Sequence, residues 1–268
     1  MTTVPSIITA EQLVQRLDEA ELLIVQVSSA QMYQQAHIPS AVRVTPEELV
    51  SGVAPAIGRL PPIERLTALF RRIGLTEEKT VVTYDDEGGG WAGRLAWTLD
   101  VIGHRKWCYL DGGLHAWAAL NLPLSIEPVE PEPSRIDIVI DATPIAEAED
   151  IIAQLDDEAL TIWDCRSFEE FVGQKVQAAR GGHIPGAVNL DWLDLMDRSR
   201  QLRLVDDLAG VLAARGITPE RDVITHCQTH HRSGLTYMAA RLLGFQRIRA
   251  YHGSWSEWGN REDTPVEV

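Results

Sequence analysis

The chain has 268 residues, of which 45% are apolar and 24% are charged, which suits one large or two ordinary globular domains and argues against disorder. The formal net charge of −15 disfavours nucleic acids and anionic membranes as partners. No apolar run approaches the roughly 20 residues of a membrane helix, and residues 1–5 (MTTVP) do not begin a signal peptide, so we expect a cytoplasmic protein.

Three segments of the first half of the chain recur in the second half in the same order. They are residues 37–42 (HIPSAV) with 183–188 (HIPGAV), 81–85 (VVTYD) with 223–227 (VITHC), and 110–117 (LDGGLHAW) with 251–258 (YHGSWSEW). Repetition of this kind predicts a duplicated domain. Because a duplicated chain needs no partner to bury its sheet edges, we expect a monomer.

Prolines crowd the join between the two copies, at Pro123, Pro128, Pro131, Pro133 and Pro144. Proline removes a backbone donor and disfavours helix, so this stretch is predicted to be an extended linker. We expect one domain over residues 1–125, the linker over residues 126–144 and a second domain over residues 145–268.

Each half alternates short apolar runs with stretches of helical spacing. Residues 159–163 (ALTIW) and 223–226 (VITH) read as strands. The helical positions are Leu235, Met238, Ala239, Leu242 and Leu243, with Gly244 as the cap that follows them. This alternation predicts an α/β fold in which each domain has a mainly parallel sheet flanked by helices.

The three cysteines differ in their surroundings. No two are close enough in sequence for a metal clip, and an odd number with wide spacing is no disulfide framework. We expect Cys108 and Cys165 to be small buried apolar residues. Cys227 instead lies in residues 226–234 (HCQTHHRSG), between a predicted strand and a predicted helix.

This position predicts a reactive thiolate at Cys227. Backbone N–H groups at a helix N-terminus lack partners and favour negative charge, which lowers the pKa of a thiol placed there. Arg232 adds a positive charge whose planar fork suits an oxyanion such as thiosulfate. The alternative is a buried cysteine beside an exposed arginine at the start of a helix.

A metal site is a second alternative, because His226, His230 and His231 lie beside Cys227. Amide groups aimed at the cysteine suit an anion better than a cation, and adjacent histidine side chains diverge, so we predict no metal. We expect His230 and His231 to line the pocket or face solvent and to add positive charge when protonated.

The sequence resembles the tandem-domain rhodaneses, the thiosulfate:cyanide sulfurtransferases, and within them a bacterial branch whose active loop reads Cys-Gln-Thr-His-His-Arg, as residues 227–232 do here. Residues 183–187 resemble the entrance motif of that family, residues 164–167 (DCRS) its Asp-x-Arg segment, and residues 251–258 its C-terminal signature. The resemblance implies two rhodanese-like domains, the second of them active.

The first copy has lost the features that the chemistry needs. Asp85 stands where the second copy has Cys227, and Asp86 and Glu87 follow it. Successive carboxylates repel an oxyanion, so the first domain is predicted to be structural and Asp85 to be an inactive counterpart. Trp91 is a candidate for the wall of the pocket, although aromatic residues are more often core.

The resemblance implies a persulfide on Cys227, formed from a small anionic sulfur donor such as thiosulfate and passed to cyanide or a thiol, with no other cofactor. Arg232 orients the donor and supports the loop. The acceptor is a small thiol, thioredoxin, or a partner in iron–sulfur or selenium delivery. The substrate-binding loop comprises Gln228, Thr229, His230, His231 and Ser233, and the residues expected to support it are Arg166, Glu170 and Trp192.

Three other functions share some of these sequence features. A cysteine phosphatase has five residues between cysteine and arginine, because phosphate sits inside its loop, whereas four residues separate Cys227 from Arg232. Mercaptopyruvate enzymes carry a Cys-Gly-Ser-Gly type of loop, which is absent here. A carrier that delivers persulfide or selenium to one partner protein shares the same loop, and the sequence leaves that alternative open.

Overall fold

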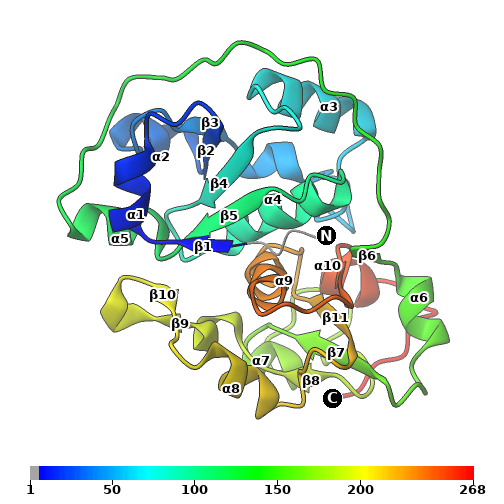
Figure 1. Cartoon of the computed structure of the whole chain (residues 1–268). Coiled ribbons are helices and arrows are strands. Elements are labelled where there is room, and N and C mark those ends of the chain that lie inside the picture. Colours follow the sequence, from blue (N-terminus) through cyan, green and yellow to red (C-terminus); the bar gives the residue numbers. More distant parts are fainter. Residues whose placement is uncertain (1–5) are drawn as a thin grey trace.

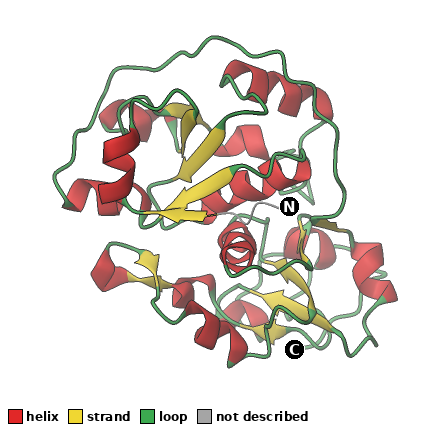
Figure 2. Cartoon of the chain, viewed as in Figure 1, coloured by secondary structure: helices red, strands yellow, loops and turns green. Residues whose placement is uncertain are grey.

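The computed structural model describes residues 6–268 as two α/β domains, one above the other in Figure 1. The sequence-based expectation about a signal peptide concerns residues 1–5 and lies outside the described residues. Among the described residues, no helix combines the length and the apolar character that crossing a bilayer requires. Figure 2 shows that helices cover the sheet of each domain.

The first domain contains five strands, five α-helices and two short 3-10 helices in its described part. In chain order these are β1 (Ser6–Ile8), α1 (Ala10–Leu13), η1 (Val14–Arg16), β2 (Leu22–Val27), α2 (Ala30–Gln35), β3 (Val42–Val44), η2 (Pro46–Leu49), α3 (Ile63–Arg72), β4 (Thr80–Tyr84), α4 (Gly90–Val101), β5 (Trp107–Leu110) and α5 (Gly113–Ala119). The strands form one parallel sheet in the order β1-β5-β4-β2-β3.

The second domain repeats this arrangement and adds a small hairpin. Its elements are β6 (Ile145–Ala146), α6 (Ala148–Ala153), β7 (Leu160–Asp164), α7 (Phe168–Phe171), β8 (Val188–Asn189), η3 (Trp192–Leu195), β9 (Met196–Asp197), η4 (Arg198–Arg200), β10 (Arg203–Leu204), α8 (Leu208–Ala213), β11 (Asp222–His226), α9 (Arg232–Leu242), β12 (Ile248–Tyr251) and α10 (Ser254–Trp258). The main sheet is again parallel, in the order β6-β12-β11-β7-β8, and β9 pairs antiparallel with β10.

The two sheets therefore have the same strand order, which confirms the duplication, the α/β class and the parallel sheets predicted from the sequence. The predicted strands at residues 159–163 and 223–226 correspond to β7 and β11, and the predicted helix corresponds to α9. Gly244 follows α9 with a φ of +86°, a left-handed conformation that glycine adopts at little cost.

Helices α4 and α9 form the main contact between the domains (Figure 1). One apolar core continues across this contact and includes Leu95 of α4 with Leu235 and Met238 of α9. Because α4 covers α9, the helix is buried on more than the one face that its sequence spacing predicted, and Tyr237 and Ala240 are buried as well.

Glycines allow these two helices to approach closely. A Cβ at Gly93 would overlap the backbone of Gly234, and a Cβ at Gly234 would lie 2.5 Å from the backbone nitrogen of Arg94. Asp100 of α4 binds across the same contact, since it accepts a hydrogen bond from the Tyr237 hydroxyl at 2.7 Å. The N-terminus of α9 is therefore held against the first domain.

Residues 126–144 contain neither helix nor strand, as their prolines predicted, and run around the outside of the first domain in Figure 1. Side chains of that domain hold them: Arg71 Nε donates to the carbonyl oxygen of Ile136 at 2.9 Å, and Trp97 Nε1 to that of Pro144 at 2.9 Å. The strands of the two sheets lie within residues 6–110 and 145–251, and we propose domains at residues 1–125 and 145–268 with a linker between them.

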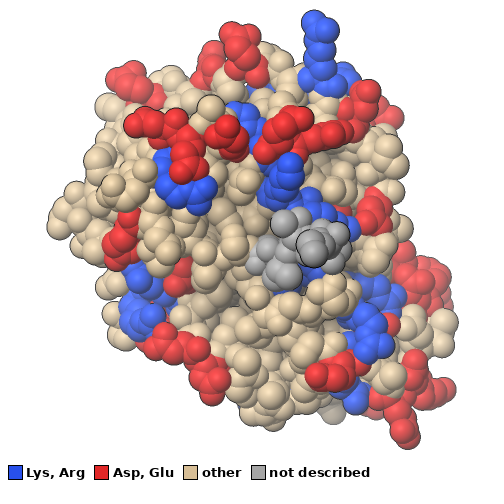
Figure 3. All heavy atoms as spheres, in the orientation of Figure 1, with Lys and Arg blue, Asp and Glu red and all other residues tan. Residues whose placement is uncertain are grey.

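Figure 3 shows Lys and Arg side chains interspersed with Asp and Glu over the visible face, and neither sign gathers into one broad patch. On this face, no broad basic patch offsets the net charge of −15 of the chain. A site that binds an anion must then obtain its positive charge locally.

We expect Gly234→Ala to push α4 and α9 apart, because its Cβ would meet backbone atoms that cannot move aside. Overpacking costs about 1–3 kcal/mol, so the free energy of unfolding measured in urea should fall by about that amount. Ala68→Ser in α3 is the control, since it also adds one heavy atom to a helix but at an exposed position. Equal stability of both variants would contradict a tight contact between the helices.

Candidate active site

Cys227 follows directly on β11 at the carboxyl edge of the second sheet, and Arg232 begins α9. The cysteine is 1% exposed. Helix α10 holds the loop between these residues from the other side: the N–H groups of Trp255 and Ser256 donate to the carbonyl oxygens of Cys227 and Gln228, each at 2.9 Å. The C-terminal motif noted in the sequence therefore positions the loop.

The Cys227 sulfur is surrounded by hydrogen-bond donors. Burial by itself raises the pKa of this thiol, because a buried charge loses its hydration. Hydrogen bonds from the Cys165 thiol and from the hydroxyl and N–H of Ser233, together with the charge of Arg232, nevertheless hold the pKa of Cys227 well below its ordinary value. Ser233 Oγ lies 3.5 Å from Cys227 Sγ. The surroundings therefore favour the thiolate.

Arg232 is paired with Glu170, which the sequence had suggested only as a supporting residue. Nη1 of Arg232 donates to Oε2 of Glu170 at 2.6 Å, and Nη2 donates to Oε1 at 2.9 Å. Burial would lower the pKa of Arg232, but the Glu170 hydrogen bonds and the Cys227 charge raise it, so the guanidinium stays charged. Because Glu170 occupies the two-nitrogen edge of the fork, that edge cannot grip a donor oxyanion as the sequence analysis envisaged.

The structure separates the two adjacent histidines of the loop. His230 is fully buried against Trp97 of the first domain, with ring centroids 4.4 Å apart, and its Nδ1 lies 2.7 Å from Ser233 Oγ. Burial, followed by the charge of Arg94, holds the pKa of His230 well below its usual range. This shift disfavours the protonated form, in which His230 was expected to add positive charge.

His231 points to the surface at the domain boundary. It stacks on Trp91 with ring centroids 4.4 Å apart, lies 5.6 Å from the ring of Trp192, and places Nε2 2.5 Å from Glu87 Oε1. Trp91, the candidate for the pocket wall, and Trp192, an expected supporting residue, thus both lie against the loop through His231. Glu87 belongs to the first domain, so both domains shape this side of the loop.

Arg166 supports the loop indirectly. Its guanidinium binds both carboxylate oxygens of Asp164 and lies 4.3 Å from the ring centroid of Trp255. The backbone N–H of Trp255 donates to the Cys227 carbonyl oxygen. Gln228 donates from Nε2 to the carbonyl oxygen of Gln177 at 3.0 Å. Of the predicted supporting residues, Glu170 alone bonds directly to Arg232, while Arg166 acts through α10.

The matching loop of the first domain is filled by its own carboxylate. Oδ1 of Asp85 accepts hydrogen bonds from the N–H groups of Glu87, Gly88 and Gly89 at 2.8–3.1 Å, and Oδ2 accepts one from Ala92 at 3.0 Å. Burial raises the pKa of Asp85, although these amides oppose the rise. Four backbone donors therefore converge on an anionic side chain at the position that corresponds to Cys227.

Arg94 is a functional candidate that the sequence analysis missed. It is fully buried in α4, and no carboxylate among residues 6–268 forms an ion pair with it. Its Nη1 donates to the carbonyl oxygen of Gly58 at 2.7 Å and reaches that of His230 at 3.5 Å. Burial lowers the pKa of Arg94 to about 9, against the opposing charge of Cys227. An arginine inside an apolar helix, with no acidic residue three or four positions away, was the available signal.

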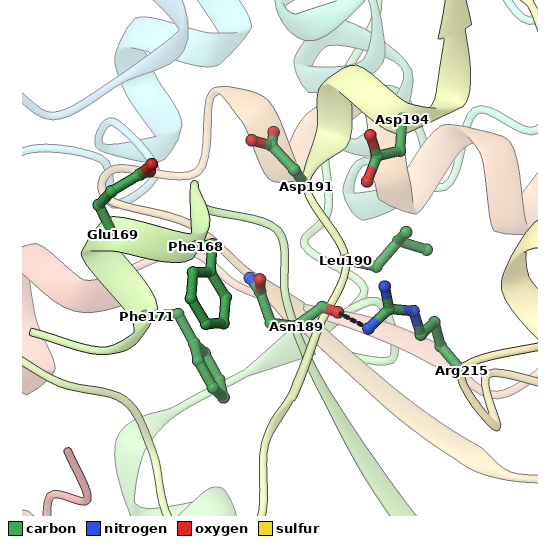
Figure 4. A pocket seen from close by; sticks show the side chains of 8 residues that line it. All are labelled: Phe168, Glu169, Phe171, Asn189, Leu190, Asp191, Asp194 and Arg215. Carbon is green, nitrogen blue, oxygen red and sulfur yellow. Dashed lines mark hydrogen bonds between the residues drawn. The ribbon is translucent and has the colours of Figure 1, made fainter.

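A pocket of about 580 Å³ lies beside α7 and β8 (Figure 4). Asp191 and Asp194 border it on one side, Phe168 and Phe171 on another, and Arg215 donates to the Asn189 carbonyl oxygen at its edge. The loop residues 227–233 do not line it. Its carboxylates repel anions, so we do not assign a sulfur oxyanion to this pocket.

The histidines near Cys227 point in different directions. His226 Nε2 lies 3.6 Å from Asp164, His230 faces Ser233, and His231 faces Glu87. In the described part of the chain, no three His, Cys, Asp or Glu side chains gather as metal ligands would.

The chain is similar to known proteins over both of its halves. The rhodanese-like domain model matches residues 9–120 and residues 147–261. A thiosulfate sulfurtransferase of Azotobacter vinelandii is 48% identical and covers 99% of this chain and 98% of its own length. One of Pseudomonas aeruginosa is also 48% identical, with 98% and 97% covered. The rhodanese-fold structure of a 3-mercaptopyruvate sulfotransferase of Escherichia coli aligns with a TM-score of 0.82 at 26% identity, covering 94% of this chain and 99% of that chain.

Arg232→Gln should raise the pKa of the Cys227 thiol, because the substitution removes a positive charge that favours the thiolate. The alkylation rate with iodoacetamide follows the thiolate fraction, so its midpoint against pH reports this pKa. We expect a wild-type midpoint below the value of about 8.5 for a free thiol, a higher midpoint in Arg232→Gln, and a smaller rise in Arg232→Lys. A Cys108→Ser background removes the other domain's thiol, whose pKa burial raises to about 11. An unchanged midpoint in Arg232→Gln would show that the arginine does not stabilise the thiolate.

Proposed function

This chain belongs to the family of rhodanese-like proteins, and from that premise we propose that Cys227 takes the outer sulfur of thiosulfate as a persulfide and passes it to cyanide or a thiol. The protein is a thiosulfate sulfurtransferase. One observation supports this role of Cys227 above all. The residue is only 1% exposed, yet hydrogen-bond donors and the charge of Arg232 surround its sulfur and favour the thiolate.

In the first half-reaction the Cys227 thiolate attacks the outer sulfur of thiosulfate. The sulfur–sulfur bond of the donor breaks, and sulfite leaves with the electron pair. A low pKa makes this attack possible at neutral pH, because the thiolate and not the thiol is the nucleophile. The persulfide that remains on Cys227 is also an anion and needs the same compensation.

The loop is proposed to cradle the persulfide with its backbone amides and with the Ser233 hydroxyl. Support comes from the first domain, where the matching loop surrounds the Asp85 carboxylate with four N–H groups. A loop of this shape therefore suits a small anion held by fixed dipoles, which require no reorganisation during the reaction. Asp85 itself has no sulfur and is the inactive counterpart.

Arg232 supplies a charge that is fixed in place. Glu170 holds its guanidinium edge, and burial would otherwise disfavour a lone charge there. We propose that Arg232 stabilises the thiolate and persulfide electrostatically, and orients the donor through N–H groups that Glu170 does not use. Arg166 and Trp192 support the loop from outside.

The remaining residues of the loop, between Cys227 and Arg232, are proposed to shape the site and to position Ser233. Gln228 and Thr229 shape the pocket beside Cys227, and His231 closes it towards the first domain. His230 positions the Ser233 hydroxyl: because that hydroxyl donates to Sγ, the neutral imidazole must donate its Nδ1 proton to Ser233 Oγ. Arg94 adds a further buried positive charge behind the loop.

In the second half-reaction an acceptor attacks the outer persulfide sulfur, and the electron pair of the broken bond returns to Cys227. Cyanide leaves as thiocyanate. A thiol, reduced thioredoxin, or a partner in iron–sulfur or selenium delivery would take the sulfur in the same way. The sulfur is carried covalently, so we propose no further cofactor. We place the protein in the cytoplasm as a monomer, without nucleic acid or membrane partners.

The direct test is thiocyanate formation from thiosulfate and cyanide. Wild type should turn over with parallel lines in double-reciprocal plots, because sulfite leaves before the acceptor binds. Cys227→Ala should fall to the uncatalysed background, because burial raises the pKa of the neighbouring Cys165 thiol and disfavours its thiolate. Cys108→Ala is the matched control and should keep the wild-type rate, since Cys108 lies in β5 of the first domain. Turnover by Cys227→Ala, or intersecting lines for wild type, would contradict the proposal.

A further inference from the structure

Cys165 lies beside the reactive cysteine and takes no step in the reaction described above. In the parallel register of β7 and β11, Asp164 pairs with His226, so the residues that follow them are Cys165 and Cys227. The Cys165 N–H donates to the His226 carbonyl oxygen at 3.0 Å, which continues the pairing past the strand ends. The two cysteines therefore occupy neighbouring positions directly after two adjacent strands of the same sheet.

The strand pairing implies a separation of the two cysteines that a disulfide can span. Adjacent strands lie about 4.8 Å apart, and disulfides join residues whose Cα atoms are about 4.4–6.8 Å apart. Both side chains belong to the same buried core cluster, and the Cys165 thiol is among the groups that lower the pKa of Cys227. The Trp192 N–H also donates to the Cys165 carbonyl oxygen at 3.2 Å, which fixes the position of Cys165.

The pair occurs only in the domain that has the reactive thiol. In the first domain the corresponding positions are Val27 and Asp85, at the ends of β2 and β4. The third cysteine, Cys108, lies in β5 and packs in a different core cluster. The chain therefore offers Cys227 a single neighbouring thiol and a distant one for comparison.

We propose that Cys165 is a resolving cysteine, which forms a disulfide with Cys227 once a hydroperoxide has oxidised Cys227 to a sulfenic acid. The inference rests on the proposed function only in that Cys227 is the reactive thiolate. Further oxidation of a sulfenic acid to a sulfinic acid is not reversed by ordinary thiols, whereas a disulfide is. The pair thus protects the sulfur-carrying residue when no sulfur donor occupies it.

The Cys227 thiolate attacks the hydroxyl-bearing oxygen of the hydroperoxide, so that a sulfur–oxygen bond forms and the oxygen–oxygen bond breaks. The sulfenic acid keeps the hydroxyl proton, and the departing oxygen takes a proton from water. The Cys165 sulfur then attacks the Cys227 sulfur, and the sulfur–oxygen bond breaks. The Cys165 proton leaves with the hydroxide as water. The hydroperoxide is reduced by two electrons, and the two thiols supply them.

The test treats the reduced full-length protein with hydrogen peroxide, blocks free thiols with iodoacetamide under denaturing conditions, and digests it with trypsin without reduction. Arg166 and Arg221 place the two cysteines in separate peptides. We expect a disulfide between the peptides of Cys165 and Cys227, an alkylated Cys108, and a loss of thiocyanate formation that dithiothreitol reverses.

Two variants sharpen the outcome. Cys108→Ser should give the same cross-link and the same recovery, because its side chain lies in the other domain. Cys165→Ser should give sulfinic or sulfonic acid on Cys227 and no recovery with dithiothreitol. Wild type with oxidised Cys227 and alkylated Cys165 would overturn the inference, as would equal recovery of wild type and Cys165→Ser. Thiocyanate formation by untreated wild type tests the proposed function separately. The cross-linked peptide shows whether Cys165 forms a disulfide with Cys227, whether or not the protein has that activity.

Discussion

The need to hold a negative sulfur almost out of water governs the architecture of the second domain. A buried charge is costly unless fixed dipoles or an opposite charge replace its hydration. Around Cys227 this compensation comes from Ser233 and Arg232 of α9 and from Cys165 after β7. These groups meet because parallel strands end at the same edge of a sheet, where a helix can begin directly after a strand. The site is thus a consequence of the fold topology.

The cost of burying a charge also explains why Arg232 is paired with Glu170. Glu170 is the third residue of α7 and forms a capping box with Ser167. This box fixes the backbone from which the Glu170 side chain reaches Arg232. Its hydrogen bonds keep the guanidinium close to the sulfur. Removing either partner would leave the other as an uncompensated, partly buried charge.

The first domain takes part in the site although its own loop holds an aspartate. Helix α4 carries Arg94 and Trp97, which contact His230 of the catalytic loop, and Glu87 contacts His231. The close contact of Gly93 and Gly234 brings these groups within reach. Duplication therefore left a domain that lost the nucleophile and kept the scaffold, with its anion loop satisfied internally by Asp85.

Sequence patterns predicted the features that depend on local order: the repeat, β7 and β11, α9, the linker, and Cys227 between a strand and a helix. They also suggested Glu170, four residues after Arg166 of the Asp-x-Arg segment, as a residue that supports the loop. The patterns did not place Arg94 near Cys227 or separate His230 from His231, because those relations arise where α4 packs on α9. Contacts between domains leave no regular spacing in the sequence, and burial of Arg94 becomes visible only once both sheets are assembled.

The central claim is that Cys227 carries the sulfur between two separate half-reactions. It is tested most directly by the intact mass of the protein after incubation with thiosulfate alone and removal of excess donor. We expect a gain of one sulfur atom per chain, release of one sulfite per chain, and loss of the added sulfur on addition of cyanide. An unchanged mass in protein that still produces thiocyanate would contradict it, because sulfur would then pass from donor to acceptor without residing on the enzyme.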